Sequence, residues 1–157
     1  MPNYSTAAFC GSATFTPAAT SHTNGDVCGT AQQFVLLDAY GAPPVPGSLL
    51  KIVTASLTIN GATVETTAWT LHLYGVTPPS ALADDAVFDL PSGDRASYLG
   101  SIAIAQVADL GATLYIEGNP GKLMKLSGTS VFGYLVNGTT LTPQNVAHVV
   151  TLLCEAV

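Results

Sequence analysis

Apolar and polar residues alternate with a period of two through most of the chain, and helical spacing is nearly absent. Residues 69–74 alternate cleanly: Trp69, Leu71 and Leu73 share one face, and Thr70, His72 and Tyr74 share the other. Residues 146–154 are largely apolar on both faces, which is typical of a strand inside a sheet. The pattern therefore predicts two strands here, the first with Trp69 in the core and the second in a central position.

Similar stretches recur along the chain and bring the expected total to about eight to nine short strands. They cover residues 33–37, 50–59, 98–105, 113–117, 122–126 and 130–136, with a weaker one at 13–16. Asn–Gly pairs at 24–25, 60–61 and 137–138 supply turns between them, and Asn119-Pro120-Gly121 predicts a hairpin. Residues 43–47 predict a stiff loop or an edge, because three of the five are prolines without a backbone N–H.

Short strands with this turn chemistry, together with 15 Gly and 10 Pro, predict an all-β fold. We expect a single-domain β-sandwich or jelly roll over residues 1–157. Two segments depart from the alternation. Residues 79–86 predict one short helix, capped by Ser80, or an ordered loop, and residues 1–12 predict an extended N-terminal arm that orders against a neighbour.

Charged residues are scarce in this chain, which limits the kinds of partner that it can bind. Only 9 % of the residues are charged, against roughly a quarter in ordinary soluble domains, while 48 % are hydrophobic. Such a surface suits burial against other subunits. With four Lys plus Arg and a net charge of -6, direct nucleic-acid binding is not expected. No apolar run approaches the ~20 residues that span a bilayer, and the start lacks a secretory pattern, so we expect cytoplasmic synthesis and no membrane partner.

The three cysteines, Cys10, Cys28 and Cys154, form no C-x-x-C pair. An odd number without metal-ligand spacing predicts neither a zinc site nor a closed disulfide framework. We therefore expect small buried thiols at these positions.

The main concentration of charge is an acidic cluster beside one arginine: Asp84, Asp85, Asp89, Asp94 and Arg95. Its spacing does not match a calcium-binding EF-hand loop, so no metal is expected. Aspartates in turns accept hydrogen bonds from nearby backbone N–H groups. The cluster predicts a structural loop in which Arg95 is hydrogen-bonded to at least one of Asp84, Asp85 and Asp89.

Other arrangements that carry catalysis are not evident. No carboxylates form an evident pair for glycoside hydrolysis, no serine lies in a G-x-S-x-G elbow, and no phosphate-binding glycine loop is present. His72 and His148 lie within strand patterns and His22 in a loop, so structural roles are expected for them. The sequence predicts a protein that is not an enzyme and needs no cofactor.

One run of sequence carries a family likeness. It extends from LHLYGVTPPSALADD at residues 71–85, through FDLPSGDR at 88–95, to YLG at 98–100. This run resembles the head decoration, or cement, proteins of tailed bacteriophages. Weaker likeness covers residues 14–20, 109–111, 114–115 and 149–152.

The resemblance implies a β-sandwich that attaches to the outside of an icosahedral head and bridges capsomers, commonly as a homotrimer. The major capsid protein and further copies of the chain would be its partners, and the virion its location. The family motif supplies no catalytic residue. Two alternatives stay open: a tail or neck component of similar build, and a carbohydrate-binding adhesin that contacts sugar through Trp69 or Tyr74.

Overall fold

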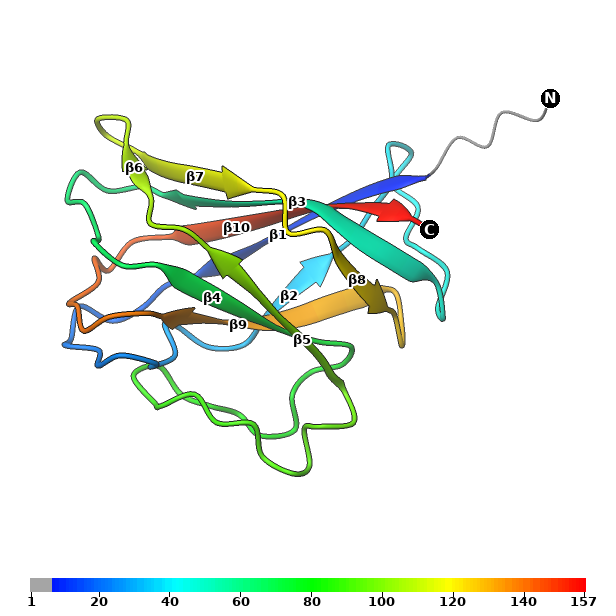
Figure 1. The fold of residues 1–157 in the computed structure, drawn as a ribbon, viewed down its shortest axis with the longest axis horizontal. Helices are drawn as coiled ribbons and strands as arrows, with labels where there is room; N and C mark the ends of the chain where they lie inside the picture. Colours follow the sequence, from blue (N-terminus) through cyan, green and yellow to red (C-terminus); the bar gives the residue numbers. More distant parts are fainter. Residues whose placement is uncertain (1–6) are drawn as a thin grey trace.

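The computed structural model describes residues 7–157, which form two antiparallel β-sheets packed face to face (Figure 1). One sheet has six strands in the order β1-β10-β3-β7-β6, with β8 also paired to β3, and the other has four in the order β2-β9-β4-β5. The strands are β1 (Ala8–Phe15), β2 (Gln32–Val35), β3 (Leu49–Ile59), β4 (Trp69–Tyr74), β5 (Tyr98–Ile104), β6 (Ala108–Asp109), β7 (Leu114–Gly118), β8 (Lys122–Lys125), β9 (Ser130–Asn137) and β10 (His148–Ala156). The predicted all-β sandwich is confirmed.

The main core lies between the two sheets, where alternation along the strands places apolar side chains inward. Trp69, Leu71 and Leu73 of β4 are buried there, as the alternation of residues 69–74 predicts. β10 lies between β1 and β3, which confirms its central position. Residues 43–47 form no strand, in agreement with their proline content.

The expected N-terminal arm is wrong for the residues that the structure describes. β1 begins at Ala8 and pairs with β10 along its whole length, from Ala8 opposite Glu155 to Phe15 opposite His148. Alternate β1 residues, including Phe9, Ala13 and Phe15, enter the core. Burial of these side chains fixes the segment in the sheet, whereas the rest of the predicted arm, residues 1–6, lies outside the described residues.

The expected hairpin at Asn119-Pro120-Gly121 is also wrong. β7 and β8 do not pair with each other, because both pair antiparallel with β3: Gly118 lies opposite Ala55, and Lys122 lies opposite Ile52. The two strands therefore run in the same direction, one after the other along β3. Pro120 has no N–H to give a ladder and Gly121 has φ +60°, so these residues interrupt one long strand path and do not reverse it.

Residues 75–97, here called the covering loop, lie over the outer face of the four-stranded sheet (Figure 1, green). They contain no helix, so the ordered-loop alternative for residues 79–86 is the correct one, and Ser80 caps nothing. A second, smaller apolar cluster forms beneath the loop. It consists of Val27, Tyr74, Tyr134 and Val136, with Leu82, Phe88, Leu90, Tyr98 and others packed against it. No helix able to cross a membrane occurs within residues 7–157.

The outer face of the six-stranded sheet has a different character. At its centre, three rows of outward side chains lie in register across β1, β10 and β3. We call them the neutral face: Thr14, Val149 and Thr58; Ser12, Thr151 and Ser56; Cys10, Leu153 and Thr54. All nine are exposed or half-buried, and none carries a formal charge at neutral pH.

Candidate functional site

Asp84 ties the covering loop to the segment that precedes β2. Its Oδ1 accepts hydrogen bonds from the backbone N–H of Gly29 at 2.6 Å and from His22 Nε2 at 3.1 Å, and its Oδ2 accepts from the N–H of Ala18 at 2.9 Å. Partial burial acts to raise the pKa of the Asp84 carboxyl, but these donors together lower it below its ordinary value. Asp84 therefore acts as an anionic clamp between two loops.

His22 is fully buried, and both of its ring nitrogens face acceptors. Nδ1 lies 3.0 Å from the Thr20 carbonyl oxygen, and Nε2 lies 3.1 Å from Asp84 Oδ1. Both bonds form only when both nitrogens carry protons, which makes the ring a cation. Burial acts to lower the pKa of His22, but the Thr20 carbonyl and the Asp84 carboxylate, helped by Asp85, raise it above its ordinary value.

The other predicted loop residues are separate from this clamp. Asp94 is buried, and its Oδ1 accepts a hydrogen bond from the Ser80 N–H at 3.1 Å. This bond joins two parts of the covering loop to each other. Asp85 is exposed with φ +66°, and Asp89 is exposed as well. The structural role of the acidic loop therefore rests on Asp84 and Asp94.

The expected pairing of Arg95 is wrong. Arg95 is exposed, and within residues 7–157 every acid–base contact closer than 4.0 Å involves a histidine. His22 takes the place that the sequence assigned to Arg95, because a buried imidazole loses less conformational entropy in holding Asp84 than a long exposed side chain would.

Arg95→Ala is therefore expected to change the free energy of unfolding by no more than about 0.5 kcal/mol. Urea denaturation monitored by fluorescence measures this change. If the free energy of unfolding fell by several times that amount, Arg95 would have to stabilise the covering loop through a contact that the structure does not show.

A second buried pair joins β10 to the segment before β4. His148 Nε2 lies 2.8 Å from Glu65 Oε2, while Glu65 Oε1 accepts from the Gln144 N–H at 2.8 Å. His148 Nδ1 faces the Val146 carbonyl oxygen at 3.0 Å, and the indole of Trp69 meets the imidazole edge-on at 5.4 Å between centroids. Every polar atom of the pair has a partner, which fits the structural role expected for His148.

The third histidine lies beneath the covering loop. The His72 ring stacks on Phe88 with centroids 3.6 Å apart, and its Nδ1 lies 2.9 Å from the Tyr98 hydroxyl oxygen. Burial lowers the pKa of His72 to about 4, so the ring is neutral at physiological pH. This environment again agrees with a structural role.

Two of the three cysteines are buried as expected, but Cys10 is exposed. Cys10 lies on the outward side of β1, so the alternation that buries Phe9 turns Cys10 to solvent. Burial raises the pKa of the Cys154 thiol to about 12 and that of Cys28 further still, which keeps both protonated and unreactive.

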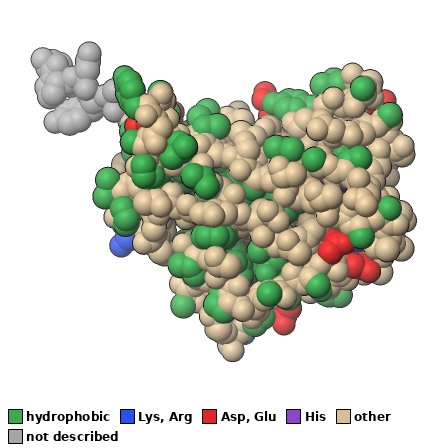
Figure 2. All heavy atoms as spheres, turned by 180° about the vertical axis from the view of Figure 1, so that it is seen from behind, with side chains coloured by type: hydrophobic (Ala, Val, Ile, Leu, Met, Phe, Trp, Pro, Cys, Tyr) green, Lys and Arg blue, Asp and Glu red, His purple; other side chains and the backbone are tan. Residues whose placement is uncertain are grey.

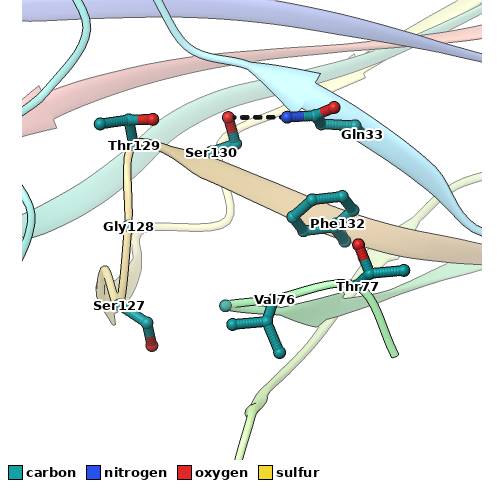
Figure 3. Close-up of a pocket in the computed structure, with 9 residues that line it drawn as sticks. Gln33, Val76, Thr77, Ser127, Gly128, Thr129, Ser130 and Phe132 are labelled. Atoms are coloured by element: carbon teal, nitrogen blue, oxygen red, sulfur yellow. Dashed lines mark hydrogen bonds between the residues drawn. The ribbon is translucent and has the colours of Figure 1, made fainter. Parts of the chain in front are cut away.

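Figure 3 shows a shallow hollow of about 360 Å³ where β4 ends and β9 begins, beside β2. Gln33, Thr77, Ser127, Thr129 and Ser130 contribute polar side chains to it. Val76 and Phe132 contribute the apolar ones, and Gly75 and Gly128 complete the lining. Sequence reasoning missed this hollow because its residues come from three separate segments. A mostly apolar hollow of about 410 Å³, lined by Ala31, Pro78, Leu82 and Tyr134 among others, shares Thr77 with it.

Metal ligands and exposed aromatic rings are the first groups to consider at these places. Within residues 7–157 no group of three or more His, Cys, Asp or Glu is arranged to hold a metal ion. The prediction that Trp69 or Tyr74 contacts sugar is wrong, because these side chains are 1 % and 0 % exposed. The hollow beside β2 is the candidate site because it combines several polar side chains with an aromatic ring.

No protein-family model matches the chain, and no curated protein matches it. Among solved structures, a chain from a semi-empty virus-like particle of the Macrobrachium rosenbergii nodavirus is 13 % identical, with 97 % of this chain and 93 % of that chain covered and a TM-score of 0.29. A chain of Broad Bean Stain Virus is 11 % identical, with coverages of 100 % and 87 % and a TM-score of 0.29. Murine APRIL is 6 % identical, with coverages of 92 % and 98 % and a TM-score of 0.28. The chain thus has a weak structural similarity to virus-particle chains and to murine APRIL.

Proposed function

We propose that this chain is a structural virion protein that decorates the outside of a phage head and stabilises contacts between capsomers, as a homotrimer bound to the major capsid protein. The observation that carries the proposal is the neutral face, an uncharged patch at the centre of a sheet whose outer side no other described strand covers. The resemblance of residues 71–100 to head decoration proteins supports the same function.

The size of this surface suits a protein contact. Strand spacing of about 4.8 Å and a rise of about 3.3 Å per residue make the outer side of the sheet roughly 25 Å across. A stable contact buries about 800 Å² on each partner, so this side and its surrounding loops are of the right order. Lys51, Glu117, Lys125 and Glu155 lie around the neutral face and not within it.

The composition of the whole surface points the same way. Figure 2 shows one side of the molecule, where neutral atoms and hydrophobic side chains predominate and acidic side chains form small separate groups. Among large apolar residues, Tyr40, Val45, Val87, Leu110 and Val157 are each more than 60 % exposed. A subunit surface of this kind gains free energy when it is covered by neighbours.

The test is made on phage heads that carry or lack the protein. Heads lacking it are expected to release DNA at a lower temperature. Heads carrying it are expected to keep it through a high-salt wash, because an uncharged contact is little screened by salt. Unchanged heat resistance after deletion, or loss of the protein at moderate salt, would contradict the proposal.

A charge placed within the neutral face locates the contact. Thr151→Glu puts a carboxylate in the middle row and is expected to abolish head binding, since burying an unpaired charge is costly. Thr142→Glu, at an exposed threonine in the loop between β9 and β10, is the matched control and should bind normally. Normal binding of a correctly folded Thr151→Glu protein would exclude this face.

A further inference from the structure

We propose that the hollow between Gln33, Val76, Ser127 and Phe132 is a binding site for a neutral sugar residue of a glycan. This inference goes beyond the proposed structural function, since it concerns a ligand of the isolated chain and not its attachment to a head. None of the nine lining residues is charged. Phosphate, carboxylate and cationic ligands would find no counter-charge in the lining, whereas a neutral ligand needs none.

The polar part of the hollow matches the hydrogen-bonding character of sugar hydroxyls. Gln33 Nε2 donates to Ser130 Oγ at 3.0 Å, which fixes the amide while leaving its oxygen and one N–H for a ligand (Figure 3). The hydroxyls of Thr77, Ser127 and Thr129 can each donate and accept. A sugar hydroxyl also does both, so a set of amide and hydroxyl groups can satisfy several of them at once.

The apolar part of the hollow supplies a surface for the C–H face of a sugar ring. The Phe132 ring points into the hollow, and Val76 lies nearby (Figure 3). Phe132 is half-buried and packs against the cluster of Tyr74, Tyr134 and Val136, so it is held in place before any ligand arrives. A binding site with its aromatic ring already ordered loses less entropy on binding.

Gly75 helps to shape the floor of the hollow. A Cβ added at this position would lie 2.7 Å from Ser127 Oγ, which is closer than atoms in contact allow. The absence of a side chain at position 75 therefore lets the Ser127 hydroxyl lie against the end of β4. Because Ser127 is exposed, Gly75→Ala would displace its hydroxyl without disturbing the core.

The size of the hollow also fits. Its volume of about 360 Å³ falls within the range of roughly 300 to 1,000 Å³ that small-molecule sites occupy. Its open side leaves room for the rest of a glycan chain to continue into solvent.

The proposal is tested by amide NMR titration of the whole chain with the methyl glycosides of glucose, galactose and N-acetylglucosamine at tens of millimolar. Glycerol and sialic acid are the comparison probes. At least one neutral glycoside is expected to shift the amides of Val76, Thr129 and Ser130. Gln33→Ala is expected to weaken that binding about five-fold, the effect of losing about one hydrogen bond.

Gln106→Ala is the matched control, an exposed glutamine outside the hollow, and should leave the affinity unchanged. Gly75→Ala should weaken binding with no change in melting temperature, which separates a binding role from a structural one. The proposal is overturned if no neutral glycoside shifts these amides, if glycerol shifts them equally, or if only sialic acid binds. Failure here would leave head decoration untouched, because the heads are tested separately.

Discussion

Glu65→Ala is expected to reduce the free energy of unfolding by about 3 to 5 kcal/mol, the usual effect of removing one partner from a buried acid–base pair. Glu65 and His148 are 4 % and 0 % exposed, and Glu65 Oε2 lies 2.8 Å from His148 Nε2 in a hydrogen bond. Without the carboxylate, His148 Nε2 and the Gln144 N–H both lose their partner in a place that water reaches poorly. Urea denaturation at neutral pH measures the loss.

Glu65→Gln distinguishes hydrogen bonding from charge in this pair. Its amide oxygen can still accept from the Gln144 N–H, and its NH₂ can donate to Nε2 of a neutral His148 whose Nδ1–H still donates to Val146. We therefore expect a loss of about 1 kcal/mol or less. Glu155→Ala, at an exposed glutamate of β10, controls for removing a surface carboxylate and should have little effect. A Glu65→Ala protein as stable as these two would contradict the assignment.

Asp84→Asn is expected to cost about 2 kcal/mol near pH 6, because three donors converge on this carboxylate and bonds to a charged acceptor are the stronger ones. The covering loop should then separate from residues 18–29 more readily. Amide hydrogen exchange at Gly29 and Ala18 reports this opening directly. Asp89→Asn is the matched control, since Asp89 is an exposed aspartate of the same loop, and it should have little effect.

The same clamp predicts a pH dependence with two sides. The pKa of His22 is raised above 6.5, so its contribution to stability is complete below 6.5 and is lost as the pH rises through the raised value. The pKa of Asp84 is lowered below 3.8, so its contribution is present above 3.8 and is lost as the pH falls through the lowered value. The clamp is strongest between these limits.

A pH series of unfolding free energies, compared between the wild-type chain and Asp84→Asn, isolates this effect from the other titrating groups. The difference between the two proteins should be largest between about pH 4 and pH 6.5 and should shrink on either side. A difference that stays constant with pH would show that the clamp does not depend on the charges of His22 and Asp84.

Sequence alone determined which side of β4 enters the core and that β10 is a central strand. Alternation at β4 places Trp69, Leu71 and Leu73 inward, and the structure buries all three. This works because side-chain direction in a strand has a period of two and depends only on neighbouring residues. The same local rule explains why Cys10 points to solvent beside the buried Phe9.

The pairing of strands and loops was decided by tertiary structure. Asn119-Pro120-Gly121 has the residues of a hairpin turn, but β3 is 11 residues long and accepts β7 and β8 one after the other. Likewise, Asp84 pairs with His22, 62 residues away in the sequence, and not with the nearby Arg95. Local sequence propensity cannot show which of two possible partners a strand or side chain will contact. The free energy of each contact depends on burial, and burial exists only once the chain has folded.

The covering loop shows both influences together. In residues 81–90 of the structure, half-buried positions such as Leu82, Phe88 and Leu90 alternate with exposed ones. The sequence predicted an ordered loop over part of this segment but not the surface that the loop would contact. The outer face of the four-stranded sheet displays the large rings of Tyr74 and Tyr134, whereas six of the nine residues of the neutral face on the other sheet are Ser or Thr, which tolerate water. That difference in apolar area directs the loop to one sheet and leaves the other open.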